Sequence, residues 1–552
     1  MLAKRFAFIA TLVFALSACG GSTAPSSSAP AVSPGSSPAA GSVTAGAAAA
    51  SKPAAASTAA SPAAGGAVKR GGTIRVALDS ETANLDPMKS SLAVDRQVMY
   101  NIYDTLVTLD KDLKIQPDLA TSWDQPDPKT YIFHLRSGVK FQDGTDFNAD
   151  AVKFSLDRYR TTATSPRASE LVDVASVDVV DPMTVKVTMK NASSPFLATL
   201  VDRSGMITSP AATQAGGDNF TRAPMKAGTG PFQFVEWQGG DHITLEKNPN
   251  YWKKDASGGA LPYADKVTYR FFPDASVRLT NLKTGDEDIQ YRIDPKDVAD
   301  VKNNPDIVFN QAPGLAWDGL TLNVKQAPFD NKAVRQAFAY AIDRPTIVKN
   351  VFFNVYSEAQ YPISPALSAY YDPSLKPYTR DVNKAKALLA QAGASNVTFS
   401  LDTTNTPATI QVSQLIKDEL AEAGITVNIN LLEFTKQIDT ASKHMFQASA
   451  FGWSGRVDPD GDISYSHLHT GGGNNYGQYS NPQVDDLLDK ARVAQTPEDR
   501  KPLYLQAMKT VTDDSPIIYL DFQPAFEIHR KNVQGYSFIP DGMIHLEGVW
   551  LS

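Results

Sequence analysis

The stretch from Pro117 to Arg158 limits most narrowly what this chain can fold into. Residues 130–136 alternate apolar and polar side chains, which predicts a strand with one buried face. Glycine-containing turns are expected at 137–138 and 143–144, directly after that strand. Asn148 then stands where it can cap a helix whose apolar side chains recur on one face. A strand, a hairpin and a helix are therefore expected to pack together here.

The C-terminal part of the chain alternates short apolar runs with helical patterns. Strands are predicted at 397–401 and 425–431, with a helix at 410–423 between them. Such a succession favours strands joined by a crossover helix. The fold class predicted for this region is therefore α/β.

Length and composition exclude several kinds of protein. A chain of 552 residues is too long for a single core and suggests two or three domains of about 100–200 residues each. Its 42% hydrophobic and 20% charged residues are ordinary for a soluble globular protein. The formal net charge of −7 supplies no basic surface for phosphate backbones, so no nucleic-acid partner is expected.

The N-terminus has the pattern of a signal peptide. Two basic residues precede an apolar run over 6–16, which is too short to span a bilayer comfortably. Residues 16–19 read Leu-Ser-Ala-Cys and look like a bacterial lipobox, so residues 1–18 are predicted to be removed and Cys19 to be lipidated. The alternative is an ordinary signal peptide cut elsewhere, which would leave Cys19, the only cysteine, without a role.

The segment that follows is built almost entirely from small residues. Residues 20–68 contain only Gly, Ser, Thr, Ala, Pro and Val, apart from one charge at Lys52. Such a segment cannot bury enough apolar surface to offset its ordering entropy, so 19–68 is predicted to be a disordered tether that starts at the lipidated cysteine. Its reach would be on the order of 40 Å, which suits a body held near a membrane partner.

Seven motifs along the chain resemble, in order and spacing, those of the family 5 solute-binding proteins. These are the peptide-binding and nickel-binding subunits of ABC importers. The motifs are the opening stretch with LATSW, FHLR and GVKFQDG, then GTGPFQFVEW (228–237), KNPNYW (247–252), PFDNKAVRQAFAYAIDR (328–344), KAKALLAQAG (384–393), GWSGRVDPDG (452–461) and YSNPQVDDLLDKA (479–491).

The resemblance implies an architecture. It is a two-lobed α/β fold like that of the periplasmic binding proteins, of the large three-domain type II subclass, with a hinge between the lobes. Domain I would be assembled from separate segments, domain II would be inserted in it, and domain III would be the second lobe. The implied segments are 69–103, 229–322 and 521–552 for domain I, 104–228 for domain II and 323–520 for domain III.

The motif at 452–461 is the first candidate for the ligand site. In oligopeptide-binding and dipeptide-binding relatives, the residues that match Gly452, Trp453 and Ser454 touch the ligand, and an aspartate three residues after the tryptophan holds the peptide's α-ammonium group. This chain has Arg456 at that position. An arginine would repel an ammonium group and could instead hold a carboxylate in a bidentate pair.

Two aspartates of the same motif could take over the ammonium contact. Asp458 and Asp460 both lie in it, but an Asp-Pro-Asp-Gly turn with solvated or backbone-capping aspartates explains them equally well. A calcium loop is not expected, because the usual downstream acidic ligand is absent from its place.

Further candidates come from other segments. Ser91, with its neighbours Leu92 and Ala93, follows the Leu-Asp-Pro turn at 85–87, where the family's cleft is lined; a solvent-facing turn is the alternative. Stacking is expected of the tryptophans and cation pairing of the aspartates. The complete set of predicted ligand contacts is Ser91, Trp317, Asn323, Gly452, Trp453, Ser454, Arg456, Asp458 and Asp521.

No residue pattern predicts a cofactor, a metal or an enzyme. His467 and His469 form an incomplete zinc set, since no cysteine or glutamate nearby completes it. The chain lacks a G-x-S-x-G elbow, an H-E-x-x-H pair and a phosphate loop. ATP hydrolysis would belong to separate subunits.

The predicted function is that of a monomeric, lipid-anchored substrate-binding protein. It would capture oligopeptide-like or dipeptide-like solutes outside the cytoplasmic membrane and deliver them, by hinge closure, to an ABC permease with its ATPase subunits. The alternatives are the same role for a non-peptide ligand (a modified peptide such as glutathione, an opine, a sugar or a nickel chelate), an extracellular hydrolase, and an adhesive or sensing surface protein.

Overall fold

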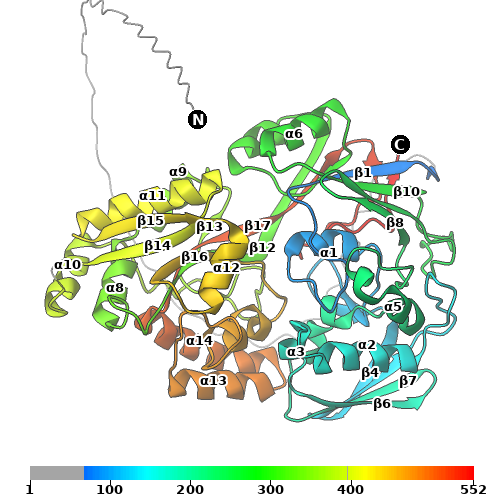
Figure 1. Cartoon of the computed structure of the whole chain (residues 1–552), viewed down its shortest axis with the longest axis horizontal. Helices are drawn as coiled ribbons and strands as arrows, with labels where there is room; N and C mark the ends of the chain where they lie inside the picture. The colour runs from blue at the N-terminus through cyan, green and yellow to red at the C-terminus, as the bar shows by residue number, and fades with distance from the viewer. Residues whose placement is uncertain (1–67, 395) are drawn as a thin grey trace, which may run out of the picture. The chain divides into compact units, whose positions relative to one another are not determined.

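Two long antiparallel strands, β12 (Ile307–Leu322) and β17 (Ile517–Arg530), lie at the centre of the computed structural model, which describes residues 68–394 and 396–552. Their pairing runs from Ile307 opposite Arg530 to Thr321 opposite Ile517. They join an eleven-stranded sheet in the order β15-β14-β16-β12-β17-β11-β1-β10-β9-β8, with β13 (Ser357–Glu358) also paired to β17. Figure 1 shows this pair passing from the elements of the C-terminal part to those around β1.

One end of the sheet is built around β1, the first strand of the chain. β1 pairs in parallel with β10 and β11, and the hairpin of β8 and β9 places Phe234 opposite Leu245. The alternate side chains on one face of these strands form a buried apolar core, and helix α1 packs into the same core. The elements are β1 (Thr73–Leu78), α1 (Ala93–Met99), β8 (Phe232–Gln238), β9 (His242–Lys247), β10 (Lys266–Phe271), α6 (Ala275–Thr284), β11 (Ile289–Gln290), η3 (Pro295–Asp297), α7 (Val298–Lys302), β18 (Val533–Gln534) and β19 (Trp550–Leu551).

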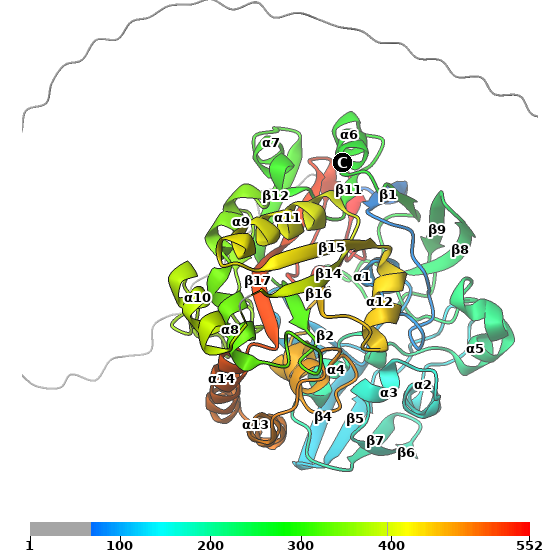
Figure 2. The ribbon, with the colours of Figure 1, turned by 60° about the vertical axis from the view of Figure 1, so that its left-hand side comes forward.

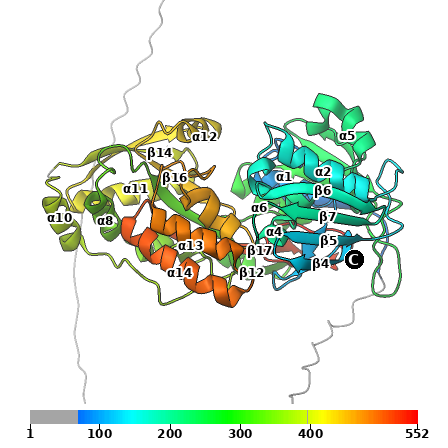
Figure 3. The same cartoon turned by 90° about the horizontal axis from the view of Figure 1, so that it is seen from below.

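A separate four-stranded antiparallel sheet, β4-β5-β7-β6, contains the strand predicted at 130–136. The predicted helix cap is confirmed, because Asn148 accepts a hydrogen bond from the backbone nitrogen of Ala151 at 3.1 Å. Helix α2 lies along this sheet (Figure 3) and shares its core. The elements are β2 (Val107–Leu109), β3 (Ile115–Pro117), β4 (Ala120–Asp127), β5 (Thr130–Leu135), α2 (Ala149–Thr161), α3 (Arg167–Glu170), β6 (Val174–Asp181), β7 (Thr184–Met189), α4 (Phe196–Thr199), η1 (Arg203–Gly205), α5 (Pro210–Gly216) and η2 (Gly217–Thr221).

The other end of the large sheet has the predicted strand, helix, strand unit. β14 and β15 are parallel, and α11 between them in sequence packs its apolar face into their core (Figure 2). The elements are α8 (Lys332–Ala341), α9 (Arg344–Asn350), α10 (Val382–Gln391), β14 (Thr398–Thr404), α11 (Pro407–Glu422), β15 (Thr426–Leu432), α12 (Phe434–Ser442), β16 (Ala448–Trp453), the π-helical segment η4 (Asp460–Leu468), α13 (Pro482–Val493) and α14 (Pro497–Asp514).

Tertiary contacts shorten one helical pattern in the sequence. Residues 91–106 suggest a helix, but α1 spans only Ala93–Met99. Asn101 bonds to the carbonyl of Ile544 at 2.8 Å, and Thr105 bridges to Met206, so the chain after α1 is held in an irregular path by distant segments.

The segmentation into three domains stays a prediction. Residues 64–552 form one compact unit, and β12 and β17 contribute to both ends of the sheet instead of stopping at a boundary. The predicted signal peptide, Cys19 and nearly all of the tether lie outside the described residues. Among the helices that the structure describes, none combines the length and the apolar character needed to cross a membrane.

Candidate ligand-binding site

The ladder between β12 and β17 is broken in the middle of the two strands. Its register shifts between Pro313 and Trp317 and again between Asp318 and Gly319. Such bulges bend a strand and redirect its side chains. Gly314 lies in the break, and a Cβ atom there would come within 2.4 Å of the carbonyl oxygen of Gln523, so the close approach of the two strands requires glycine.

A small cavity of about 60 Å³ lies at this break. It is lined by β12 and β17, by α1, by the segment after β11 and by the residue that follows β16. Apolar and polar side chains both line it, and the polar and charged ones include Arg96, Gln290, Arg292, Ser454, Gln523 and Asp541.

An arginine cluster lies beside this cavity, and it consists of Arg96, Arg167, Arg203 and Arg456 around the carboxylates of Asp202 and Glu170. Three of the guanidiniums surround Asp202: Arg96 at 2.9 Å, Arg203 at 3.5 Å and Arg456 at 3.7 Å. Glu170 is 2.6 Å from Arg167 and 3.9 Å from Arg456. The members come from α1, from the segment 167–203 and from the loop after β16, so the cluster joins parts of the chain that are far apart in sequence.

Burial and the neighbouring guanidiniums shift the pKa values of the groups in this cluster. Burial alone would raise the pKa of Asp202, but Arg96, Arg203, Arg456 and Arg167 together hold it far below its ordinary value. Burial, followed by the neighbouring Arg167, lowers the pKa of Arg203 to about 9. Burial is also the main cause of the lowered pKa of Arg456.

Ser454 connects the cluster to the cavity. Its hydroxyl oxygen accepts hydrogen bonds from Arg96 at 3.2 Å and from Arg456 at 3.4 Å. The guanidinium of Arg456 also lies 4.7 Å from the ring centre of Trp453 and donates to the carbonyl of Gly455 at 2.7 Å. Of the predicted residues Trp453, Ser454 and Arg456, Ser454 therefore lines the cavity, and Arg456 contacts both of the others.

The two predicted tryptophans have different surroundings. Trp317 is opposite Trp453 in the β12–β16 ladder, and His467 contacts both rings edge-on, at 5.9 and 4.6 Å. Trp317 is only 1% exposed and packs on Tyr519, so it supports the site from the core and cannot stack on a ligand in this conformation. Burial, with Arg456 adding to it, lowers the pKa of His467 to about 3, so its imidazole is neutral.

Two carboxyl groups lie opposite each other on β12 and β17. Asp318 and Asp521 are paired in register, and Gln523 donates to Asp318 at 2.7 Å. Asp521 is 1% exposed. Burial and then the charge of Asp318 raise the pKa of Asp521 well above its ordinary value. Gly452 lies against the same pair, since a Cβ atom there would be 2.2 Å from an oxygen of Asp318.

Asp458 has a partner inside the protein. Its carboxylate binds Arg500 in a bidentate pair at 2.6 and 2.7 Å, and both residues are buried. The neighbouring Asp460 binds Arg492 at 2.9 Å. In this conformation both carboxylates are paired with arginines, which anchors the loop on α13 and α14; the role of Asp458 as a ligand contact stays a prediction.

Asn323 and Ser91 also differ from the expectation. Asn323 is fully buried and bonds to the carbonyls of His444 and Phe446, so its amide holds β12 to the segment before β16 and does not reach the cavity. Ser91 is exposed at the start of α1, whereas Ala93, two residues later, lines the cavity.

Sequence reasoning missed several residues of the site. Arg96, Arg203, Asp202 and Arg292 belong to no motif quoted above, and their spacing has no period that would single them out. Only the tertiary structure brings Arg96, Asp202 and Arg203 beside Arg456, and Arg292 into the lining of the cavity.

The two histidines that were considered as metal ligands, His467 and His469, have different neighbours. His467 is in contact with the tryptophans, whereas His469 is 3.3 Å from Asp489 and 4.0 Å from Asp485. In the part of the chain that the structure describes, no three or more His, Cys, Asp or Glu side chains are arranged to hold a metal ion.

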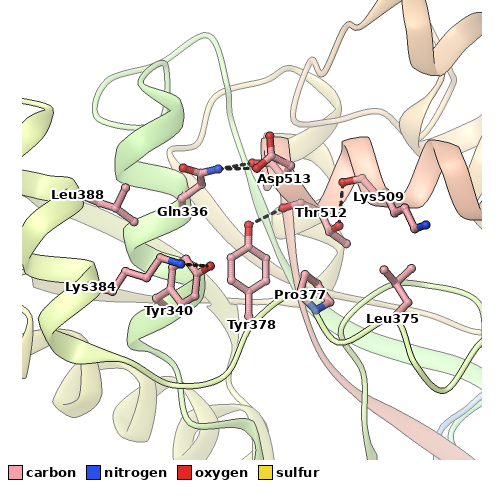
Figure 4. Close-up of a pocket in the computed structure, with 10 residues that line it drawn as sticks. All are labelled: Gln336, Tyr340, Leu375, Pro377, Tyr378, Lys384, Leu388, Lys509, Thr512 and Asp513. Carbon is pink, nitrogen blue, oxygen red and sulfur yellow. Dashed lines mark hydrogen bonds between the residues drawn. The ribbon is translucent and has the colours of Figure 1, made fainter.

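A second cavity, of about 300 Å³, lies between α8, α10 and α14 and contains none of the predicted site residues. Its polar side chains are bound to one another: Figure 4 shows Lys384 on the hydroxyl of Tyr340, at 2.6 Å, and Gln336 on Asp513. The cavity at the hinge break is therefore the better candidate, because charged groups from several distant segments meet there.

Comparison with known proteins connects this geometry to a transport role. The model of the bacterial extracellular solute-binding proteins, family 5 (middle part), matches residues 114–475. The glutathione-binding protein GsiB of Escherichia coli (strain K12) is 32% identical over 480 residues, which cover 84% of this chain and 92% of that protein.

Two solved structures are similar in fold and in sequence. DppA from Helicobacter pylori, an ABC transporter-associated periplasmic binding protein in complex with the peptide STSA, is 28% identical, with a TM-score of 0.77 and coverage of 88% of this chain and 98% of that one. AgaA from A. tumefaciens R10, in complex with agropinic acid, is 30% identical, with a TM-score of 0.78 and coverage of 87% and 99%.

Proposed function

This chain belongs to the bacterial extracellular solute-binding proteins of family 5, and from that membership we propose that it captures a carboxylate-bearing, peptide-like solute and delivers it to the permease of an ABC importer. Relatives that bind glutathione, a peptide and agropinic acid support this range of ligands. All three ligands carry carboxylate groups.

The observation that carries the proposal is the position of Arg456. It stands where peptide-binding relatives have an aspartate for the ligand's ammonium group, and its guanidinium bonds to Ser454, which lines the cavity together with Arg96. Guanidinium groups bind carboxylates in bidentate pairs, so this arrangement suits the acidic end of a solute.

The break in β12 and β17 supplies the means of closure. Two strands that pass through both ends of the sheet can act as a hinge where their ladder is interrupted, because few backbone hydrogen bonds must then change. Ligand contacts from α1 on one side and from the loop after β16 on the other would favour the closed state.

The proposal also includes where the protein is held in the cell. Lipidation of Cys19 would hold the protein on the outer side of the cytoplasmic membrane, and residues 20–68 would let the body reach its permease. Chemical turnover of the bound solute forms no part of this role.

Thermal unfolding with candidate ligands tests the proposal. The purified protein is heated alone and with glutathione, tripeptides, an opine, a sugar and nickel–histidine, each at a large excess. A ligand at 100 times its Kd adds about 2.7 kcal/mol to the stability of the native state, which gives a clear shift. We expect shifts with the carboxylate-bearing peptides and the opine, and intact ligand afterwards by chromatography.

Two variants connect the shift to the site. Trp453→Ala and Arg456→Ala should each weaken binding at least tenfold, whereas Arg222→Gln, which changes an arginine outside the cavity, should not. A shift with the sugar alone, or unchanged affinity in both variants, would overturn the proposal.

A further inference from the structure

Two of the side chains that line the cavity at the β12–β17 break keep a buried polar atom without a hydrogen-bond partner. They are Arg96, through its Nε, and Gln290, through its Oε1, and no other described residue of the lining shares this property. Resting on the proposed function, we propose that Gln290 is a specificity-determining residue that accepts a hydrogen bond from a peptide N–H group of the solute, while Arg96 donates to an oxygen of the same solute.

The side chain of Gln290 is held in one orientation. It is the second residue of β11, and only 3% of the residue is exposed. Its amide nitrogen donates to the backbone carbonyl of Arg292 at 2.8 Å. Because only the nitrogen end of the amide can donate to a carbonyl, this bond also fixes which end is the oxygen. Oε1 is therefore an acceptor in a defined position, and none of the described groups donates to it.

An unpaired amide oxygen at a buried position is uncommon in proteins. The large majority of buried polar groups have a hydrogen-bond partner, since a group without one loses its bonds to water and gains nothing in return. The cation nearest in sequence, Arg292, has other contacts: it donates to Asp79 at 3.2 Å and lies 5.0 Å from the ring centre of Tyr291. A ligand N–H at Oε1 would supply the missing bond, and because the acceptor is already fixed, little side-chain entropy would be lost on binding.

Arg96 offers the complementary donor. It lies on α1 and is 5% exposed, and its two terminal nitrogens donate to Asp202 at 2.9 Å and to Ser454 at 3.2 Å. These bonds leave Nε, the third nitrogen of the guanidinium, without an acceptor among the described residues. The lining of one cavity therefore contains both an unused donor and an unused acceptor.

Access to these two atoms depends on the hinge. The cavity holds only about 60 Å³, and both atoms are covered in this conformation. Its walls come from different segments, since Gln290 belongs to β11 whereas Ser454 follows β16. In the proposed role these walls move apart when the hinge opens, so a solute could enter before they close on it.

A peptide has the groups that match this pair of atoms. Each of its peptide units carries one N–H donor and one carbonyl acceptor. A carboxylate accepts hydrogen bonds but donates none, so a solute that is recognised by its acidic end alone would leave Oε1 of Gln290 unpaired. Within the proposed class of ligands, the unused acceptor therefore favours peptides over carboxylate solutes that lack an amide N–H.

Titration calorimetry with amide and ester probes tests this inference on the full chain. Ala-Ala-Ala and glutathione are each compared with two analogues, in which an ester oxygen replaces one or the other of the two peptide N–H groups. The replacement removes a donor while the charges and nearly the whole shape stay the same. For each peptide that binds, we expect one of its two analogues to bind at least tenfold more weakly, because Oε1 of Gln290 is then left unpaired.

A substitution at Gln290 assigns the preference to this side chain. Gln290→Met has a similar size but lacks the amide acceptor, so it should reduce the preference for the peptide over its ester to less than threefold. Gln414→Met, at an exposed position of α11, is the control and should leave the ratio unchanged. The unfolding midpoint of each variant shows whether it is folded. A crystal structure of the natural chain with the bound peptide tests the contact without any variant, since a peptide nitrogen should lie within about 3.2 Å of Oε1.

The outcomes separate this inference from the proposed function. Equal affinities of a peptide and both of its analogues, a preference that persists in Gln290→Met, or a complex in which no peptide nitrogen reaches Oε1 would overturn the role of Gln290 and leave the transport role in place. Binding of an opine but of neither peptide would also overturn the role of Gln290 alone. Binding of a sugar or a metal chelate alone would overturn both proposals.

Discussion

Asp202 is the residue on which the arginine cluster depends. Its carboxylate lies within 3.7 Å of Arg96, Arg203 and Arg456, and only 5% of the residue is exposed. Removing one partner of a buried ion pair costs about 3–5 kcal/mol, because the remaining charge is left without compensation.

Asp202→Asn should therefore lower the free energy of unfolding by about 3–5 kcal/mol at pH 7, measured in urea. The folded-state pKa of Asp202 is depressed, so its stabilising effect is present above the unfolded value of about 3.9 and is lost as the pH falls below it. The difference between the natural chain and the variant should begin to shrink at about pH 4 and should keep shrinking as the pH falls further, because the folded-state pKa of Asp202 lies far below the unfolded value. Asp112→Asn, at an exposed ion pair, is the control and should have little effect.

Substitution of a second aspartate, Asp458, distinguishes a structural role from a ligand-binding role. Because its bidentate pair with Arg500 is internal, Asp458→Asn should cost about 3–5 kcal/mol of stability while the folded protein keeps its affinity for the ligand. Unfolding in urea and calorimetry below the transition measure the two quantities. Asp486→Asn, on the exposed face of α13, is the matched control. A large loss of affinity without loss of stability would return Asp458 to the ligand site.

At the scale of elements, the hinge depends on how closely β12 and β17 approach each other. Gly314 and Gln523 are in contact where the ladder is interrupted, and this interruption forms one wall of the cavity. The break thus couples the geometry of the two strands to the geometry of the site.

Gly314→Ala should destabilise the protein by about 1–3 kcal/mol and weaken ligand binding, because the added methyl group meets backbone atoms that cannot move independently. Thermal unfolding and titration calorimetry check both effects. Gly473→Ala provides the control, since a methyl group there meets nothing within 4 Å. Equal behaviour of the two variants would show that the strands separate easily at this point.

Most individual elements could be predicted from local pattern. The strand of β5, the helix of α2 with its Asn148 cap and the β14–α11–β15 unit follow the alternation and the capping residues in the sequence. The first helix was predicted too long, because its end is set by contacts of Asn101 and Thr105 with distant segments.

At the scale of the whole molecule, the proposed membrane anchor precedes the described residues in the sequence. The body includes residues 68–394 and 396–552, whereas the predicted anchor is Cys19. Anchoring and ligand binding should therefore be independent properties of the chain.

Cys19→Ala should release the protein from the membrane without changing its ligand affinity. Expressed in bacteria with its signal peptide, the natural chain is expected in the detergent phase of a Triton X-114 extract and the variant in the aqueous phase. Recovery of both chains in the aqueous phase would argue against lipidation, and would leave the solute-binding role untouched.

The family and the fold class follow from the order of motifs, because each motif is a local arrangement of strand, turn and helix that its own residues specify. The ligand site follows only in part. Trp453, Ser454 and Arg456 belong to one motif, and Ser454 lines the cavity in contact with Arg456, but Asp458, four residues after Ser454, turns inward to Arg500. Arg96, Asp202 and Arg203 reach the same place from other segments. Local sequence specifies elements through short-range backbone and side-chain preferences, whereas the partners of a charged side chain depend on long-range packing that brings distant segments together.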